Sequence, residues 1–176
     1  PARAAALNWQ ASETDRAADG AEHASGAPCL PRYPMKALVI FNPVAGNGRG
    51  AVLGLRASER LRAAGWEATV MESASPRQRL AASEGGAAVS NREELFAAAA
   101  RARAVLVVGG DGTLREVLTD LQDLPERPPL AIVPAGNANV LAREYAIPLD
   151  PDAAVDLVLK GETQAVDCGV ANERLF

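Results

Sequence analysis

Short apolar runs alternate with amphipathic segments from residue 35 onward. Continuous stretches of Val, Leu, Ile and Ala predict strands that are covered on both faces, at 37–41, 104–108 and 130–133. A further strand is predicted at 66–71, and helices at 51–64, 90–103, 114–121, 139–145 and 151–159. Because strands that alternate with helices pair in parallel, this pattern predicts an α/β fold with helices on both faces of a parallel sheet.

Local signals mark the ends of some of these helices. Gly65 is expected to end the helix at 51–64, in which Val52, Leu55 and Leu61 recur near helical spacing. Ser90 and Glu93 form a capping box that opens the helix at 90–103. The stretch 75–86 is ambiguous between a short helix and a loop.

The composition changes at about residue 35. Residues 1–34 are Ala, Gly, Pro and Ser with scattered charges and no sustained period, which predicts a disordered N-terminal extension. The folded domain is therefore expected at 35–163, and the final segment, 164–176, is expected to be extended.

Charge and composition argue against several functions. The chain has 18 Lys and Arg against 22 Asp and Glu, and 4% aromatic residues, so it lacks the basic clusters and stacking platforms that bind nucleic acid. Cys29 and Cys168 are far apart in the sequence, which argues against a disulfide scaffold or a zinc site and favours the reducing cytoplasm. No apolar run approaches the roughly 18 residues of a membrane span.

Three predicted strands end in loops whose residues suit ligand binding, and in open parallel sheets ligands bind at the carboxyl ends of the strands. The first loop, 42–50, contains Gly46, Gly48 and Gly50, which would let a ligand approach the backbone closely. The helix that follows offers free N–H groups to an anion. An ordinary strand-to-helix turn explains this loop equally well.

The second loop is the strongest indication of chemistry, and its sequence is Gly109-Gly110-Asp111-Gly112-Thr113. A glycine-rich turn before a helix exposes backbone donors that suit phosphate oxygens. Asp111 would repel a phosphate unless it faces Mg²⁺, the water shell of that ion, or a hydroxyl group to be held or deprotonated. Thr113 either caps the helix or binds a phosphate, and Glu116 complements the helix dipole.

The third loop runs from Pro134 to Asn139 and again joins a strand to a helix. Asn137 and Asn139 either cap that helix or hydrogen-bond a base, a ribose or a phosphate. Both interpretations stay open at this point.

Together these motifs resemble the diacylglycerol kinase catalytic domain, and more closely the bacterial soluble lipid kinases that are grouped with sphingosine and ceramide kinases. They are Phe41-Asn42-Pro43 with Gly46, Gly109 to Thr113 with Glu116-Val117, Pro134 to Asn139 with Ala142-Arg143, and Val166 to Gly169. The resemblance covers Met35 to Phe176. NAD kinases share the Gly-Gly-Asp motif but follow their third strand with a different pattern.

The resemblance implies the Rossmann-like, three-layer N-terminal domain of NAD kinases and diacylglycerol kinases. It implies transfer of the γ-phosphoryl group of ATP, with Mg²⁺, to the hydroxyl of a lipid such as diacylglycerol at a membrane surface. Asp111 would be the catalytic and metal-binding residue. The residues implied to bind the nucleotide are Asn42, Gly46, Gly109, Gly110, Asp111, Gly112, Thr113, Glu116, Gly136 and Asn137.

The chain departs from the family pattern in two places. Asn137 stands where the family usually has Thr or Ser. The family also has a Ser or Thr after the second strand that touches the nucleotide, and Ser73, Ser75 and Ser90 are all candidates for it.

The resemblance also implies a second, β-sandwich domain, which we expect to be largely absent from this chain. Residues 164–176 would be its first strand, left without partners. We therefore expect a fragment that binds nucleotide and is inactive alone in lipid phosphorylation. The alternatives are a non-catalytic nucleotide-binding fragment and an NAD kinase-like enzyme. The substrate class implies a cytoplasmic protein in peripheral contact with the inner membrane face, and a homodimer is left open.

Overall fold

The computed structural model describes residues 34–73, 91–161, 163–171 and 174–175. The expectations for 1–33, for the stretch 75–86 and for the Ser90 cap lie outside these residues.

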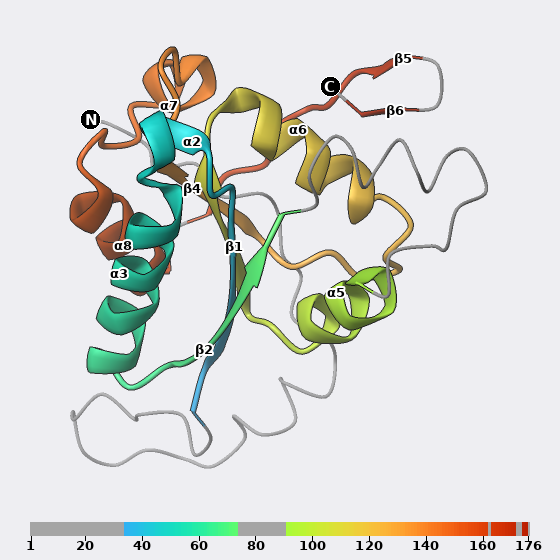
Figure 1. Ribbon diagram of the computed structural model, residues 1–176. Coiled ribbons are helices and arrows are strands. Elements are labelled where there is room, and N and C mark those ends of the chain that lie inside the picture. Colours follow the sequence, from blue (N-terminus) through green and yellow to red (C-terminus); the bar gives the residue numbers. More distant parts are fainter. Residues whose placement is uncertain (1–33, 74–90, 162, 172–173, 176) are drawn as a thin grey trace, which may run out of the picture.

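A four-stranded parallel sheet forms the centre of the domain (Figure 1). The strands lie in the order β2-β1-β3-β4, with bounds β1 Lys36–Phe41, β2 Glu67–Glu72, β3 Ala104–Gly109 and β4 Leu130–Pro134. All six residues of β3 are buried, as its uninterrupted aliphatic sequence predicts for a central strand. The predicted parallel α/β fold is confirmed.

The register of the sheet brings the ends of three strands level. Phe41 pairs with Val108, and Gly109 pairs with Pro134. The loops that follow β1, β3 and β4 therefore start side by side at the carboxyl edge of the sheet.

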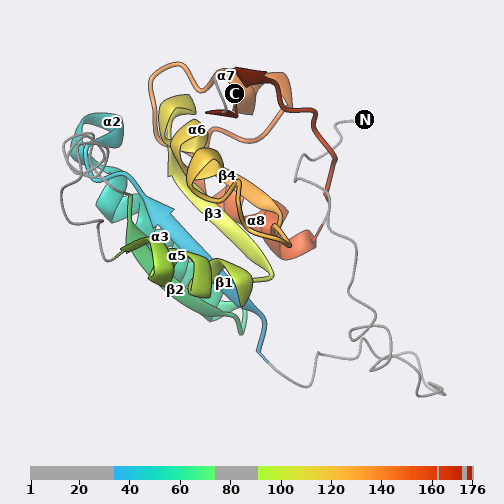
Figure 2. The same cartoon turned by 90° about the vertical axis from the view of Figure 1, so that its right-hand side faces the viewer.

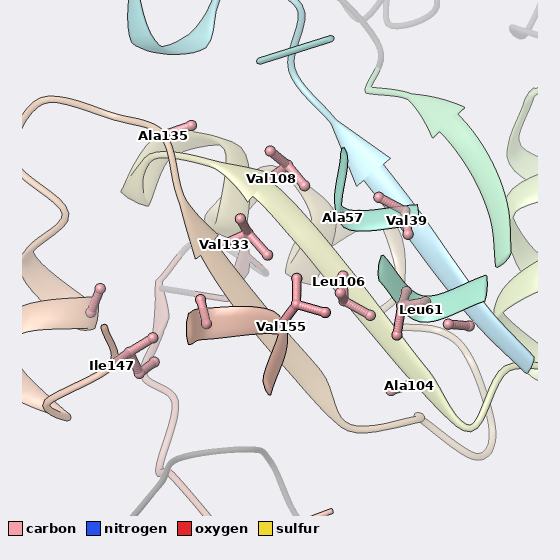
Figure 3. Close-up of a cluster of buried hydrophobic side chains, with 13 residues drawn as sticks. Val39, Ala57, Leu61, Ala104, Leu106, Val108, Val133, Ala135, Ile147 and Val155 are labelled. Atoms are coloured by element: carbon pink, nitrogen blue, oxygen red, sulfur yellow. The ribbon is translucent and has the colours of Figure 1, made fainter. Parts of the chain in front are cut away.

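Helices cover both faces of the sheet, which makes three layers (Figures 1 and 2). On one face lie α3 (Gly50–Ala63) and α8 (Pro151–Lys160), and on the other α5 (Asn91–Ala100) and α6 (Asp111–Asp120). A hydrophobic core lies on each face of the sheet. The core under α3 and α8 joins Val39, Leu106 and Val133 of the sheet to Leu61 and Val155 of the helices (Figure 3). These side chains are at most 1% exposed, and their burial supplies most of the driving force for this packing.

The helix predicted at 51–64 is present as α3, but two of the three apolar residues whose spacing indicated it are not buried. Val52 and Leu55 are 66% and 55% exposed, whereas Gly50, Gly54, Ala57, Ser58 and Leu61 are buried. The reason is close packing of α3 on β1: a Cβ on Gly54 would lie 2.8 Å from the Cβ of Phe41. Small residues therefore mark the buried face of this helix more reliably than large ones.

The helix α8 has clear signals at both ends and two ion pairs to α3. The Asp150 side chain accepts a hydrogen bond from the backbone N–H of Ala153, and Gly161 ends the helix in a left-handed conformation. Arg56 pairs with Asp152, and a second Arg–Asp pair lies one turn further along. The hydrogen bond that Arg56 donates to Asp152, together with the negative charge of that carboxylate, raises the pKa of Arg56 above its ordinary value. Such exposed pairs add little to stability.

Two features of the structure, the start of α6 (Asp111–Asp120) and the pairing of the last described segment, correct the sequence-based expectations. Helix α6 begins at Asp111 and not at Leu114, so part of the glycine motif forms the first helical turn. The segment after α8 is not left without partners, because β5 (Val170–Ala171) pairs antiparallel with β6 (Arg174–Leu175). Across the described ranges, no helix is both long and apolar enough to span a membrane.

Candidate functional site

The three loops after β1, β3 and β4 meet at the carboxyl edge of the sheet, and we call them the three-loop edge. The backbone N–H of Asn42 donates to Val108 O at 3.0 Å, and that of Ala135 donates to Gly109 O at 2.9 Å. The sheet ladder thus continues one residue into the first and third loops, which fixes where each loop departs.

Asn42 connects the first loop to the second. Its amide oxygen accepts a hydrogen bond from the backbone N–H of Val44 at 3.1 Å. Its amide nitrogen then faces Thr113 and donates to the Oγ1 atom at 3.0 Å. The first bond fixes which end of the amide points to Thr113, so Asn42 acts as an oriented donor.

Gly46 brings the first loop against the third. It lies in the short α2 segment (Ala45–Gly48) with a left-handed backbone, φ +59°. A Cβ at this position would lie 2.6 Å from the carbonyl oxygen of Ala135. Both the conformation and the close approach require glycine here.

Gly110 and Gly136 bring the second loop against the third. A Cβ on Gly110 would lie 3.1 Å from the Cα of Gly136, and a Cβ on Gly136 would lie 2.6 Å from the Cα of Gly110. Gly109 is equally crowded, because its Cβ would lie 2.6 Å from the Cβ of Thr113. These three glycines have a packing role inside the domain.

Gly112 differs from these glycines. It is exposed in the first turn of α6, and a Cβ on it would meet no atom within 4 Å. Internal packing therefore gives no reason for glycine at this position. Glycine leaves the backbone of this turn open to solvent.

Asp111 caps the helix α7 (Val140–Glu144), which begins after the third loop. Its two carboxylate oxygens accept hydrogen bonds from the backbone N–H groups of Val140, at 3.0 Å, and Leu141, at 3.1 Å. A carboxylate at a helix N-terminus is favourable both as an acceptor and because of the helix dipole. Asn139 is the N-cap residue of α7, but its side chain makes no capping bond, so of the two interpretations left open for it the cap is not what the structure shows; Asp111 of the second loop accepts from the helix instead.

Asn139 is the main residue that the sequence-based list of site residues leaves out. It is 9% exposed and has a left-handed backbone, φ +48°. Its side chain accepts from the backbone N–H of Gly136 at 3.0 Å and donates to the carbonyl of Gly136 at 2.8 Å. The sequence does carry a signal, because asparagine directly before a helix often adopts this conformation.

The remaining predicted residues occupy different settings. Glu116 is half-buried in α6, and Asn137 is exposed at the tip of the third loop. Among the serine candidates, Ser73 is 8% exposed and follows β2, and its backbone N–H donates to Phe41 O at 2.8 Å. Ser75 and Ser90 lie outside the described residues.

The donor groups at this edge suit a phosphate-bearing ligand. Helix α6 starts at the edge, and its N-cap residue, Gly110, has no side chain to accept from the first-turn amides. Within the described ranges, no three carboxylate, imidazole or thiol side chains gather into a metal site. Asp111 keeps one free lone pair on each oxygen, which fits Mg²⁺ held by a single carboxylate through water and by phosphates.

Comparisons with known proteins agree with this arrangement. Residues 36–171 match the family model of the diacylglycerol kinase catalytic domain. A diacylglycerol kinase of Staphylococcus saprophyticus is 39% identical over 72 residues, which are 41% of this chain and 24% of that protein. A diacylglycerol kinase of Staphylococcus carnosus gives the same identity and the same coverage.

A solved structure agrees as well. The crystal structure of a diacylglycerol kinase from Bacillus anthracis superposes on this chain with a TM-score of 0.63 and 25% sequence identity. The match covers 84% of this chain and 49% of the chain in that structure. The chain thus spans about half the length of that solved protein, and the matched stretch is about a quarter of the curated relatives.

Proposed function

The chain belongs to the diacylglycerol kinase catalytic domain family, and on that premise we propose that its three-loop edge binds ATP with Mg²⁺ for transfer of the γ-phosphoryl group to a lipid hydroxyl. The observation that carries the proposal is the open first turn of α6. Gly112, the one glycine of the motif whose Cβ would meet no other atom within 4 Å, lies in this turn, and no side chain caps the N–H groups of the turn. The acceptor would be diacylglycerol or a related lipid at a membrane surface.

The residues of the edge would act mainly by positioning. Phosphoryl transfer needs alignment and charge stabilisation more than covalent chemistry by the protein. The first-turn amides of α6 would hold phosphate oxygens, and the oriented amide of Asn42 would keep Thr113 in place beside them. Because these groups are fixed before the ligand arrives, little reorganisation is needed when it binds.

Asp111 would hold the metal ion and order the third loop at the same time. Mg²⁺, when bound, neutralises the charge that develops on the phosphate oxygens. The two amides of α7 fix the plane of the Asp111 carboxylate. Each oxygen keeps a lone pair beyond its bond to α7, with which it would hold the metal ion or accept from the acceptor hydroxyl.

A second candidate function is nucleotide binding without transfer. It needs only the phosphate-binding part of the three-loop edge, the open first turn of α6. The two functions share the same edge and differ only in whether a phosphoryl group leaves the nucleotide.

Calorimetric titration with ATP, with and without Mg²⁺, tests the shared part. We expect binding that requires the metal and that adenosine, which lacks phosphates, does not reproduce. Incubation with γ-labelled ATP and dioctanoylglycerol then separates the two functions, because only a kinase transfers label to the lipid. Absence of ATP binding by the folded chain would refute both.

A further inference from the structure

Two arginines flank the three-loop edge without a carboxylate partner among the described residues. Arg49 lies between α2 and α3, Arg143 lies in α7, and both are exposed. The arginines of α3 that face α8, and Arg92 of α5, instead form ion pairs with aspartates. Arg49 and Arg143 therefore bring two full positive charges to this edge, and no described carboxylate offsets them in an ion pair.

Each of these two arginines is held by one nitrogen to its own loop. Arg49 Nε donates to the carbonyl of Gly46 at 3.0 Å, and Arg143 Nε donates to the carbonyl of Ala138 at 2.9 Å. A guanidinium group has five N–H donors, so four remain on the two terminal nitrogens of each side chain. In the part of the chain that the structure describes, no acceptor takes up those four. Each fork is thus fixed in place and open to a ligand.

The topology places the two side chains on either side of α6. Strand β3 lies between β1 and β4, so the start of α6 lies between the first and third loops, as Figure 2 shows. Arg49 folds back against the first loop, because its Nη2 atom lies 3.6 Å from where a Cβ on Gly46 would stand. Arg143 reaches back along α7 towards the helix end that Asp111 caps.

From this arrangement we propose that Arg49 and Arg143 bind the β- and γ-phosphates of the nucleotide from the two sides of the first turn of α6. The proposal rests on the proposed function, because it adds two binding residues to the same site. Arginine suits the task, since its planar fork matches phosphate oxygens with paired hydrogen bonds. Because the Nε bonds already fix each fork, less conformational entropy is lost when a phosphate binds.

The charge of the ligand gives the two arginines a distinct task. The first turn of α6 offers backbone amides, which carry only about half a unit of positive charge, and one acidic residue, Asp111. A nucleotide triphosphate stays negatively charged after one Mg²⁺ ion has bound, and guanidinium groups can offset the rest. The arginines should therefore favour ATP over AMP, whose single phosphate reaches fewer of these donors.

Modification of arginines by phenylglyoxal locates the bound phosphates in the unmodified chain. We would label the chain with and without ATP and Mg²⁺ and follow each arginine by peptide mass spectrometry. Arg127 is the control, because it is exposed and precedes β4 at the opposite edge of the sheet. With ATP at about ten times its Kd, modification of Arg49 and Arg143 should slow about tenfold and that of Arg127 should not change. AMP at the same concentration should protect neither.

Substitutions measure what each arginine contributes to affinity. Arg49→Gln and Arg143→Gln should each weaken ATP binding about tenfold or more, because each removes charged hydrogen bonds to phosphate. The matched Arg127→Gln makes the same change in net charge and should alter ATP affinity less than about twofold. Arg49→Lys keeps the charge but loses the fork, so it should recover only part of the affinity. Thermal unfolding checks that each variant is folded.

The outcomes separate this proposal from the proposed function. ATP binding that protects neither arginine, or that both folded glutamine variants retain unchanged, would overturn the proposal and leave the nucleotide site standing. Variants that lose only cosedimentation with vesicles of phosphatidylcholine and phosphatidylglycerol would assign the arginines to lipid headgroups, which also overturns it. Arginine-dependent binding of inorganic triphosphate by a chain that does not bind ATP would support a phosphate clamp while refuting the proposed function.

Discussion

Gly112→Ala separates a ligand-binding role of the glycine motif from a structural one. Gly112 is exposed in the first turn of α6, and a Cβ there would meet no atom within 4 Å. Its backbone φ is not in the left-handed range, so alanine fits without strain. The domain itself should therefore tolerate the change.

The expected effects on stability and on binding have opposite signs. Alanine is favoured over glycine in a helix by about 0.5–1 kcal/mol, with the lower end suited to a first turn. In a chain of this size, each kcal/mol corresponds to about 2–4 °C in Tm. If phosphate oxygens lie against this turn, the added methyl group should weaken ATP binding at least about tenfold, or about 1.4 kcal/mol.

Thermal unfolding and calorimetric titration of the same preparations measure the two effects. Gly109→Ala is the matched control, because its Cβ would lie 2.6 Å from that of Thr113 and should lower stability by crowding. An unchanged ATP affinity in a stable Gly112→Ala variant would show that no phosphate lies over this turn. The assignment of the motif to phosphate binding would then be wrong.

Three further predictions concern packing and loop order. Asp111→Asn should lower the free energy of unfolding, measured by urea titration, by about 1–2 kcal/mol, because an amide offers only one oxygen to the two α7 N–H groups. An unchanged free energy of unfolding would contradict the capping role of Asp111. Asn139→Ala should lower the free energy of unfolding by about 1–3 kcal/mol, since it removes both hydrogen bonds to Gly136 and leaves alanine in a left-handed conformation. Asn139→Gly should lower it less, and equal losses in the two variants would refute the role of backbone strain. Leu61→Ala should lower the free energy of unfolding by about 2–5 kcal/mol, because Leu61 is fully buried between α3 and the sheet. Leu55→Ala, at an exposed position of the same helix, is the control and should change that free energy little.

Strand positions could be predicted from the sequence because their signal is local. The run Ala104–Val108 is apolar without interruption, and it became the buried central strand β3. Helix faces were less predictable. Val52 and Leu55 have helical spacing yet lie in solvent, because α3 packs on β1 through Gly54 and its other small residues. Packing distance decides that outcome, and no local pattern reports it.

The sequence by itself determined the alternation of strands and helices and the presence of three glycine- and asparagine-rich loops after strands. Parallel strands place such loops at one edge, so the location of the candidate site followed as well. The tertiary structure decided which residues join the loops. Asn42 bonds Thr113 across 71 residues, and Asp111 caps α7 across 29. Contacts of this range depend on sheet register and on backbone approach at Gly110 and Gly136, and those are set only when the whole sheet has formed.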